Sequence, residues 1–278
     1  MLNKLVLAQV IDHALMEDMN NGDITTDVLI EENSISQAMI TVKEEGVIAG
    51  LSVAEMVFKR LDEHMIFTYL KKDGDRINKG ENIAKIEGKT AVILKGERTA
   101  LNILQRMSGI ATKARQYADL VQGTKTRIVD TRKTTPGLRM LEKYAVRIGG
   151  CHNHRFNLSD AVMIKDNHIE AVGGIEKAIR IARENIPHTM KIEVEVETLE
   201  QLKEALEAKA DIIMLDNMDM ETMRKAKEIT GEKAILEASG NITMDRVSQI
   251  AEIGIDVISV GALTHSVKAL DISLNIYK

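Results

Sequence analysis

The chain has 278 residues, of which 44% are hydrophobic and 28% charged, and its net charge is −5. No apolar run approaches the roughly 18 residues that a membrane-spanning helix needs, and acids come too early in residues 1–18 for a secretory signal, so we expect a cytoplasmic protein with no membrane partner. The single cysteine, Cys151, excludes an intrachain disulfide, and the 3% of aromatic residues argues against nucleic acid as a partner.

The first third of the chain mixes helical and strand-like patterns. Helices are expected over 1–18, 51–61 and 97–107, the last ending at Ser108-Gly109. Short runs typical of strands lie at 37–43, 65–70, 82–86 and 90–94, separated by turn residues that include several glycines. Short strands joined by such turns favour an antiparallel sheet, so this part is predicted to be an α+β unit.

From Arg127 onward the pattern changes to short runs of branched apolar residues that alternate with helical stretches. Strands are expected at 128–129, 162–164, 192–196, 212–215, 234–236 and 257–260, and helices between them include 199–208 and 220–230. This alternation predicts a parallel sheet, either closed as a barrel or doubly wound. Polar residues follow almost every strand, which favours the α/β barrel, because its active site is built at the carboxyl ends of the strands.

Residues 126–168 form a basic segment in an acidic protein. They contain eight Lys or Arg residues against four acids, a net charge of +4, so the remainder of the chain sums to −9. Arg132 and Lys133 follow one expected strand and Lys165 follows the next. Cations gathered at strand ends predict a site for a small polyanion.

Acidic residues follow the later strands. Glu193, Glu195 and Glu197 alternate with branched residues and share one face of a strand, where they either meet Lys, Arg or a divalent cation or lie on an exposed edge. Asp216 comes directly after the next strand, and its alternative role is a helix cap. Glu195 paired with Asp216 would suit Mg²⁺, which takes one or two carboxylates together with phosphate oxygens and water.

Small residues follow the last two strands, at 239–241 (Ser-Gly-Asn) and 260–262 (Val-Gly-Ala). Glycine there lets backbone N–H groups approach a phosphate, although ordinary turns between a strand and a helix need small residues too. The sequence Cys151-His152-Asn153-His154 matches no usual zinc spacing. A histidine beside Arg155 is better interpreted as part of an anion clamp.

These motifs, in this order, resemble one family. They are GDITT at 22–26, ERTALNILQRMSGIAT at 97–112, DTRKTTPGLR at 130–139, GGCHNHRFNLSD at 149–160, MIKDNH at 163–168, IEVEVE at 192–197, MLDN at 214–217, LEASGNI at 236–242 and ISVGALTHS at 258–266. The chain is similar nearly end to end to quinolinate phosphoribosyltransferase, also called carboxylating nicotinate-nucleotide pyrophosphorylase. Cys151 and Asn157 stand where many relatives have glycine, which affects loop geometry but removes no matched charge.

The resemblance implies an N-terminal α+β sandwich domain over 1–109, to which 266–278 returns, and an incomplete, open α/β barrel of type II phosphoribosyltransferases over 110–265. It implies a homodimer or homohexamer. It also implies that quinolinate and phosphoribosyl pyrophosphate react, with Mg²⁺, to give nicotinate mononucleotide, pyrophosphate and CO₂ in de novo NAD synthesis.

The resemblance assigns roles to residues as well. Quinolinate would be bound by Arg98 of the neighbouring subunit and by Thr131, Arg132, Lys133, His154, Arg155 and Lys165. Phosphoribosyl pyrophosphate would be bound by Lys133, Lys165, Glu195, Asp216, Ser239, Gly240, Asn241, Val260, Gly261 and Ala262. Lys133, Lys165, Glu195 and Asp216 would be the catalytic residues, and Glu195 and Asp216 would hold Mg²⁺, directly or through water.

Two other interpretations compete with this one. A pyrophosphorylase-like relative associated with molybdenum transport has the same fold and a substrate that is not established, but the full set of cations favours a dicarboxylate. A non-catalytic anion-binding or carrier protein is the other. Glu195 and Asp216 argue against it, because a pure anion binder gains nothing from carboxylates that do not bind metal.

Overall fold

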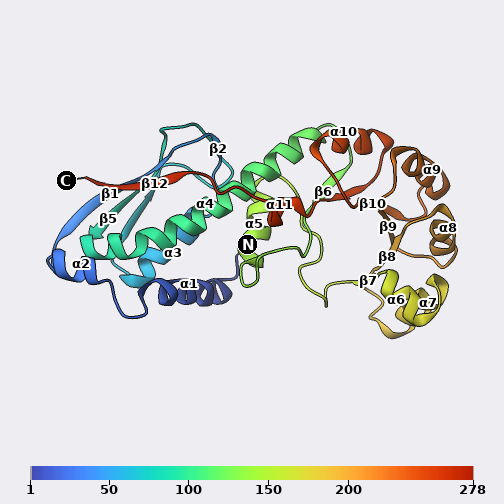
Figure 1. Ribbon diagram of the computed structural model, residues 1–278, viewed down its shortest axis with the longest axis horizontal. Helices are drawn as coiled ribbons and strands as arrows, with labels where there is room; N and C mark the ends of the chain where they lie inside the picture. The colour runs from blue at the N-terminus through green and yellow to red at the C-terminus, as the bar shows by residue number, and fades with distance from the viewer. Residues whose placement is uncertain (1, 278) are drawn as a thin grey trace. The chain divides into compact units, whose positions relative to one another are not determined.

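The computed structural model describes residues 2–277 (Figure 1). The chain divides into two compact units. Unit 1 contains the described residues up to Arg115, together with Thr134–Gly150 and those from Leu263 onward, and unit 2 contains Gln116–Lys133 and Cys151–Ala262. In the part of the chain that is described, no helix is both long enough and apolar enough to cross a membrane.

Unit 1 is built on a four-stranded antiparallel sheet. Its strands, in spatial order, are β12 (Ile272–Tyr277), β1 (Ile35–Val42), β5 (Asn82–Lys89) and β3 (Ile66–Tyr69). The last strand of the chain thus pairs with the first, and Figure 1 shows β12 beside β1. A separate pair is formed by β2 (Gly46–Val47) and β4 (Arg76–Ile77). This arrangement confirms the predicted α+β fold class.

Helices complete unit 1. They are α1 (Lys4–Met19), α2 (Ile24–Leu29), α3 (Leu51–Leu61), the first part of α4 (Thr90–Leu120), α5 (Arg139–Ile148) and, from Leu263, α11 (Ala262–His265). Phe58 of α3 is fully buried, and a Cβ atom at Gly96 of α4 would lie 2.8 Å from its ring. Glycine at position 96 therefore allows α3 and α4 to pack closely.

Helix α4 corrects two sequence-based expectations. Residues 90–94, expected as a strand, form the first turn of α4, and the helix continues through Ser108 and Gly109 instead of ending there. Ser108 is fully buried and its Oγ accepts a hydrogen bond from Ala49 N at 3.1 Å. A Cβ at Gly109 would lie 2.2 Å from the carbonyl oxygen of Lys268. These two residues are small because other segments pack against the helix at this point, not because they end it.

Unit 2 contains a six-stranded sheet in which every pairing is parallel. Its spatial order is β6 (Arg127–Val129), β11 (Val257–Ser259), β10 (Ile235–Ser239), β9 (Ile212–Asp216), β8 (Ile192–Val196) and β7 (Val162–Ile164). Strands β6 and β7 are the two edges, so the sheet is open. The incomplete α/β barrel that the sequence predicts is confirmed, and the doubly wound alternative is excluded because the strands follow one another in order from β7 to β11, with β6 beside β11.

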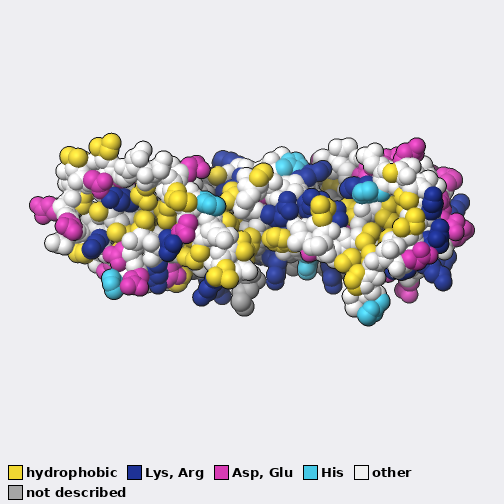
Figure 2. Space-filling view, turned by 90° about the horizontal axis from the view of Figure 1, so that it is seen from below, with side chains coloured by type: hydrophobic (Ala, Val, Ile, Leu, Met, Phe, Trp, Pro, Cys, Tyr) yellow, Lys and Arg dark blue, Asp and Glu magenta, His cyan; other side chains and the backbone are white. Residues whose placement is uncertain are grey.

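Helices connect and cover these strands (Figure 1). They are α6 (Asp166–Val172), α7 (Ile175–Asn185), α8 (Leu199–Glu207), α9 (Met220–Thr230) and α10 (Met244–Ile253). Their outer surfaces mix both signs of charge, as the right-hand end of Figure 2 shows, with ion pairs one turn apart such as Arg180–Glu184 at 3.4 Å and Lys225–Glu221 at 2.7 Å.

The division into units differs from the expected ranges at 134–150, and by a few residues at 110–115 and 263–265. Residues 134–150 fall within the range expected for the barrel, but they lie in unit 1. Glu142 of α5 is buried and accepts a hydrogen bond from Arg106 Nε at 2.9 Å, and Tyr144 OH donates to Asp73 at 2.8 Å. Hydrogen bonds with residues distant in sequence hold this segment in unit 1. The periodicity of apolar residues cannot predict such contacts.

Candidate active site

A cavity of 610 Å³ lies in unit 2, at the carboxyl ends of the parallel strands. All of its lining residues belong to unit 2. Eleven of the residues predicted from the sequence line it: Thr131, Arg132, Lys133, His154, Arg155, Lys165, Glu195, Asp216, Ser239, Gly240 and Asn241. Parallel strands place their carboxyl ends at one edge of the sheet, which is why residues up to 110 positions apart meet here.

The two acids at the tips of β8 and β9 have different partners. Glu195 of β8 forms an ion pair and a hydrogen bond with Lys165. Of the two alternatives that the sequence left open for this acid, a cationic partner or an exposed edge, the structure therefore shows the cationic partner. Asp216 of β9 accepts a hydrogen bond from Asn217 Nδ2 at 2.7 Å. It does not cap the following helix, because Asp219 accepts the hydrogen bond from Thr222 N at the start of α9. Asp216 is therefore available to a ligand in the cavity.

The turn after β10 is linked to the turn after β9. Gly240 has φ +85°, and a Cβ there would lie 2.2 Å from Asn217 Oδ1, so only glycine fits. Asn217 and Asn241 themselves have φ values of 53° and 48°, a region that asparagine tolerates better than most residues. Asn241 Nδ2 donates to Asn217 Oδ1 at 3.0 Å. The glycine predicted from the sequence is thus required by a close approach between two strand ends.

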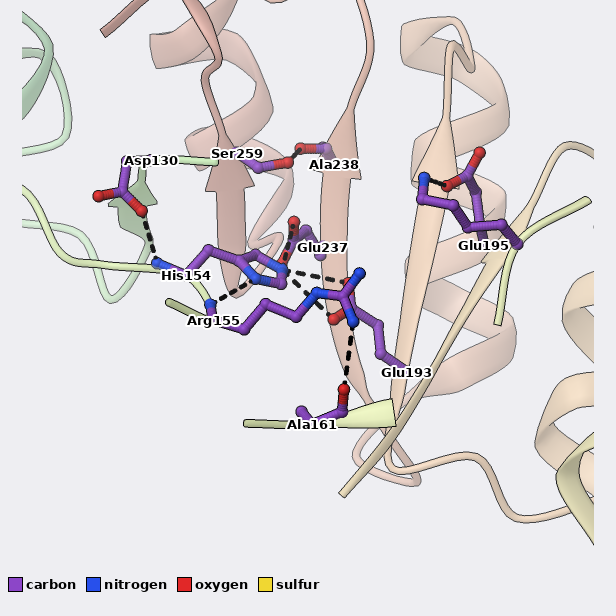
Figure 3. Close-up of polar contacts among 10 residues, drawn as sticks. Asp130, His154, Arg155, Ala161, Glu193, Glu195, Glu237, Ala238 and Ser259 are labelled. Carbon is purple, nitrogen blue, oxygen red and sulfur yellow. Dashed lines mark hydrogen bonds and ion pairs between the residues drawn. The ribbon is translucent and has the colours of Figure 1, made fainter. Parts of the chain in front are cut away.

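Asp130 holds the turn that carries His154 and Arg155. It follows β6, is fully buried, and accepts a hydrogen bond from His154 N at 2.9 Å (Figure 3) and another from Asn153 Nδ2 at 2.6 Å. These contacts fix the backbone of this turn beside Thr131, Arg132 and Lys133, and so bring the two basic segments of the sequence together.

The His154 ring points toward two buried acids, Glu193 and Glu237 (Figure 3). Its Nε2 lies 3.3 Å from Glu193 Oε2 and 3.5 Å from Glu237 Oε1, and its Nδ1 accepts a hydrogen bond from Arg155 N at 2.7 Å. The Arg155 guanidinium donates from Nη1 to the carbonyl oxygen of Ala161 at 3.2 Å. Both ring nitrogens of His154 are therefore engaged by the protein.

Burial and charge shift the pKa values in this group. Burial disfavours the charged ring, but the hydrogen bond with Glu193 and the negative charges of Glu193 and Glu237 outweigh it and raise the pKa of His154 to about 10. Burial also raises the pKa of Glu193. Because Arg155 N donates to Nδ1, the ring proton that faces the two acids is the one on Nε2.

These three side chains also have the composition of a metal site. His154, Glu193 and Glu237 each offer a ligand atom, and the three atoms lie within 4.8 Å of one another. A metal on Nε2 would require the ring proton on Nδ1, where Arg155 N already donates. The group is consequently suited to holding a proton. Glu195 and Asp216, with oxygen donors at the mouth of the cavity, fit Mg²⁺ better.

Burial and charge also act on the Arg155 guanidinium. Burial lowers the pKa of Arg155, and the positive charge of Arg132 lowers it further, whereas the carboxylates of Glu193 and Asp160 oppose this shift. Two guanidiniums close enough to repel each other constitute a strongly positive wall of the cavity. Such a wall favours a ligand with more than one negative charge.

Four predicted residues lie elsewhere. Arg98 is exposed on α4, in unit 1. Val260, Gly261 and Ala262 follow β11 but do not line the cavity. Conversely, Glu237, Asn217 and Asp130 stand in motifs quoted from the sequence but were not assigned a role. Glu237 could have been, because it stands two residues before Ser239 on one strand and hence on the same face.

Comparison with known proteins identifies the family. A model of the quinolinate phosphoribosyl transferase N-terminal domain matches residues 23–108, and one of the C-terminal domain matches 110–275. A probable carboxylating nicotinate-nucleotide pyrophosphorylase of Bacillus subtilis (strain 168) is 47% identical over 275 residues, covering 99% of this chain and 95% of that protein. A decarboxylating mitochondrial quinolinate phosphoribosyltransferase of Nicotiana glauca is 42% identical over 289 residues, covering 97% and 82%.

A solved structure agrees with these relatives. The crystal structure of NadC from Streptococcus pyogenes superposes with a TM-score of 0.95 at 42% identity, covering 100% of this chain and 99% of that one. Since family models match both parts of the chain and the relatives match almost its full length, the chain belongs to the quinolinate phosphoribosyl transferase family.

Proposed function

We propose that this protein transfers the phosphoribosyl group of phosphoribosyl pyrophosphate to quinolinate and removes one carboxyl group, giving nicotinate mononucleotide, pyrophosphate and CO₂ for de novo NAD synthesis. The observation that carries the proposal is the cavity of unit 2, which combines four cationic side chains with two acids at strand tips in a member of this family: Arg132, Lys133, Arg155, Lys165, Glu195 and Asp216. We place the reaction in the cytoplasm.

Quinolinate carries two adjacent carboxylates, and the basic wall of the cavity suits them. Arg132 and Arg155 present guanidinium groups, which bind carboxylates through paired N–H donors. Thr131 and Lys133 line the same part of the cavity. A substrate with two negative charges relieves the repulsion between the two arginines, whereas a pyridine with one carboxylate relieves only part of it.

Phosphoribosyl pyrophosphate would lie along the tips of β8, β9 and β10. The turn at Gly240 and Asn241 offers backbone N–H groups to the 5′-phosphate, and Val260–Ala262 follow the neighbouring strand. Glu195 and Asp216 would hold the ribose hydroxyls and Mg²⁺. When bound, Mg²⁺ would neutralise charge on the departing pyrophosphate. Lys165 would then exchange its contact with Glu195 for a contact with the ligand.

The chemistry requires positioning and charge and no covalent nucleophile. The ring nitrogen of quinolinate attacks C1 of the ribose while pyrophosphate leaves, through a transition state with oxocarbenium character, and Lys133 and Lys165 stabilise the negative charge that develops. The ribosylated nitrogen is positively charged, so it stabilises the electron pair left at C2 when CO₂ departs. C2 then takes up a proton.

We also propose that the protein works as a homodimer or homohexamer in which Arg98 reaches the quinolinate site of a neighbouring subunit. The exposed position of this side chain on α4 is compatible with that role. Gel filtration with light scattering would measure the assembly. Mixing an Arg98→Ala subunit with a subunit inactivated at Lys133 should restore activity only if the arginine acts across the interface.

The quinolinate clamp, the set of cations proposed to bind the two carboxylates, is tested by measuring turnover of variants. Arg155→Ala and Lys133→Ala should each lower kcat/KM for quinolinate by about 100-fold or more, because each removes a charge-assisted contact to substrate. Arg224→Ala and Lys177→Ala remove exposed cations of α9 and α7 and serve as matched controls. Normal turnover in the first two variants would show that these residues do not bind the substrate.

A further inference from the structure

Two carboxylates lie buried in unit 2, where an α/β barrel usually places branched apolar side chains. Glu193 of β8 is 2% exposed and Glu237 of β10 is 3% exposed. Burying a carboxylate without compensation is costly, and a second one close by adds repulsion. A cavity that binds acidic substrates gains nothing from them directly, so their role must be exercised through a neighbour.

That neighbour is His154. Its Nε2 is the polar atom that faces both carboxylates, at 3.3 Å from Glu193 Oε2 and 3.5 Å from Glu237 Oε1 (Figure 3). Glu237 Oε1 is buried and makes no hydrogen bond within the described residues. An oxygen in that position holds the proton of Nε2 on the ring by charge alone, because a neutral ring with its proton on Nδ1 would turn a lone pair toward two carboxylates.

The tautomer determines what His154 does next. With the proton on Nε2, Nδ1 has a lone pair, and it accepts the backbone N–H of Arg155 at 2.7 Å. The other tautomer would place two N–H groups against each other at this distance. The acids on β8 and β10 are thus connected through one imidazole to the backbone of the residue whose guanidinium lines the cavity.

We propose that Glu193 and Glu237 are positioning residues which, acting through His154, fix Arg155 for the dicarboxylate substrate. The inference rests on the proposed function, because it assigns Arg155 to the quinolinate clamp. In this account His154 serves Arg155 and not the substrate, since both of its ring nitrogens are already engaged by the protein.

A purely structural role makes a different prediction. Asp130 already holds the backbone of this turn through His154 N at 2.9 Å, so the turn is anchored without the two glutamates. If Glu193 and Glu237 only filled space, leucine and glutamine would replace them equally well. If they fix the tautomer, glutamine should partly succeed, because it keeps an acceptor oxygen, and leucine should fail.

The first experiment measures binding of quinolinate and of phosphoribosyl pyrophosphate separately by calorimetry. Glu193→Leu should raise the Kd of quinolinate by about 10- to 100-fold, the range found in metal sites when a residue that orients a histidine is removed. Glu193→Gln should recover most of this loss. The Kd of phosphoribosyl pyrophosphate should change by less than about twofold, because its contacts are separate. Glu197→Gln, an exposed acid four residues farther along the chain, is the matched control.

The second experiment asks whether the acids act through Arg155. In an Arg155→Ala background, where quinolinate is titrated to millimolar concentration, Glu193→Leu should cause no further loss of affinity. Independent, multiplied losses would overturn the inference. So would equal affinities of the Leu and Gln variants. Circular dichroism should show that each variant is folded, and the nitrogen chemical shifts of the His154 ring, which need no substrate, should report a proton on Nε2 in the unmodified protein. A neutral ring with its proton on Nδ1 would also overturn it.

Failure of the inference and failure of the proposed function give different results. If the unmodified protein binds no quinolinate at all, the proposed function is wrong and the inference falls with it. If the unmodified protein binds quinolinate and Glu193→Leu binds it equally well, the clamp stands and only the positioning role is refuted.

Discussion

Replacing Gly240 by alanine should weaken the binding of phosphoribosyl pyrophosphate without affecting quinolinate. Gly240 has φ +85°, where an L-residue pays about 1–2 kcal/mol. The added Cβ would lie 2.2 Å from Asn217 Oδ1, so the asparagine side chain must move. It then loses its hydrogen bonds with Asn241 at 3.0 Å and Asp216 at 2.7 Å, which contribute about 1–2 kcal/mol together.

The sum, about 3 kcal/mol, corresponds to about a 100-fold higher Kd if ligand binding requires the native turn. Calorimetry with phosphoribosyl pyrophosphate and Mg²⁺ measures it. A second variant, Asn217→Gly alone, deletes the same two hydrogen bonds while its new glycine suits φ 53°, and should show only the part of the loss that these hydrogen bonds cause. Alanine at the exposed Gly231, which also has positive φ but meets nothing within 4 Å, is the control for backbone strain alone.

Unchanged affinity for phosphoribosyl pyrophosphate in folded Gly240→Ala would refute the reasoning, because the ligand would then not depend on the linked turns after β9 and β10. A loss of quinolinate affinity of the same size would also refute it, since the effect would not be local to that end of the cavity.

Three further predictions concern stability, pH and metal. Glu142→Gln should lower the free energy of unfolding by about 3 kcal/mol, because it leaves the Arg106 guanidinium facing a neutral, buried amide; chemical denaturation compared with exposed Glu252→Gln measures this. The pKa of His154 is raised from its ordinary value of 6.5 to about 10, so between these two pH values the folded chain binds more protons than the unfolded chain. The free energy of unfolding should therefore fall as pH rises from about 6.5 to 10, by at most about 1.4 kcal/mol per pH unit. Glu193→Gln should flatten that dependence, and an equally steep slope in the variant would contradict the assignment. EDTA should abolish turnover and Mg²⁺ restore it, whereas Glu195→Gln should raise the Mg²⁺ concentration required; full activity in EDTA would exclude the metal.

Much of the barrel could be read from the sequence because its strands are short apolar runs ended by polar residues. The strand tips at Lys165, Glu195 and Asp216 were located by this pattern, and the structure places all three at one cavity. The carboxyl ends of parallel strands share one edge of the sheet, so residues at these ends must lie near one another. Their proximity could therefore be predicted from the strand pattern alone, without three-dimensional coordinates.

Other features depend on packing that the pattern does not encode. Ser108 and Gly109 end a helix in many proteins, yet here they lie inside α4 because Ala49 and Lys268 approach it closely. The partners of Glu193 and Glu237 depend on where the 153–155 turn lies, and Asp130, whose carboxylate fixes that turn, begins the DTRKTTPGLR motif but was given no role from the sequence. The sequence placed His154 at the cavity, as the structure does, but it could not show that the ring faces Glu193 and Glu237.

The central claim is tested most directly by incubating the purified protein with quinolinate, phosphoribosyl pyrophosphate and Mg²⁺, and following nicotinate mononucleotide and CO₂ together. Nicotinate serves as the parallel substrate. The account predicts equal amounts of both products from quinolinate and no mononucleotide from nicotinate. Mononucleotide from nicotinate, or no product from folded protein, would contradict it.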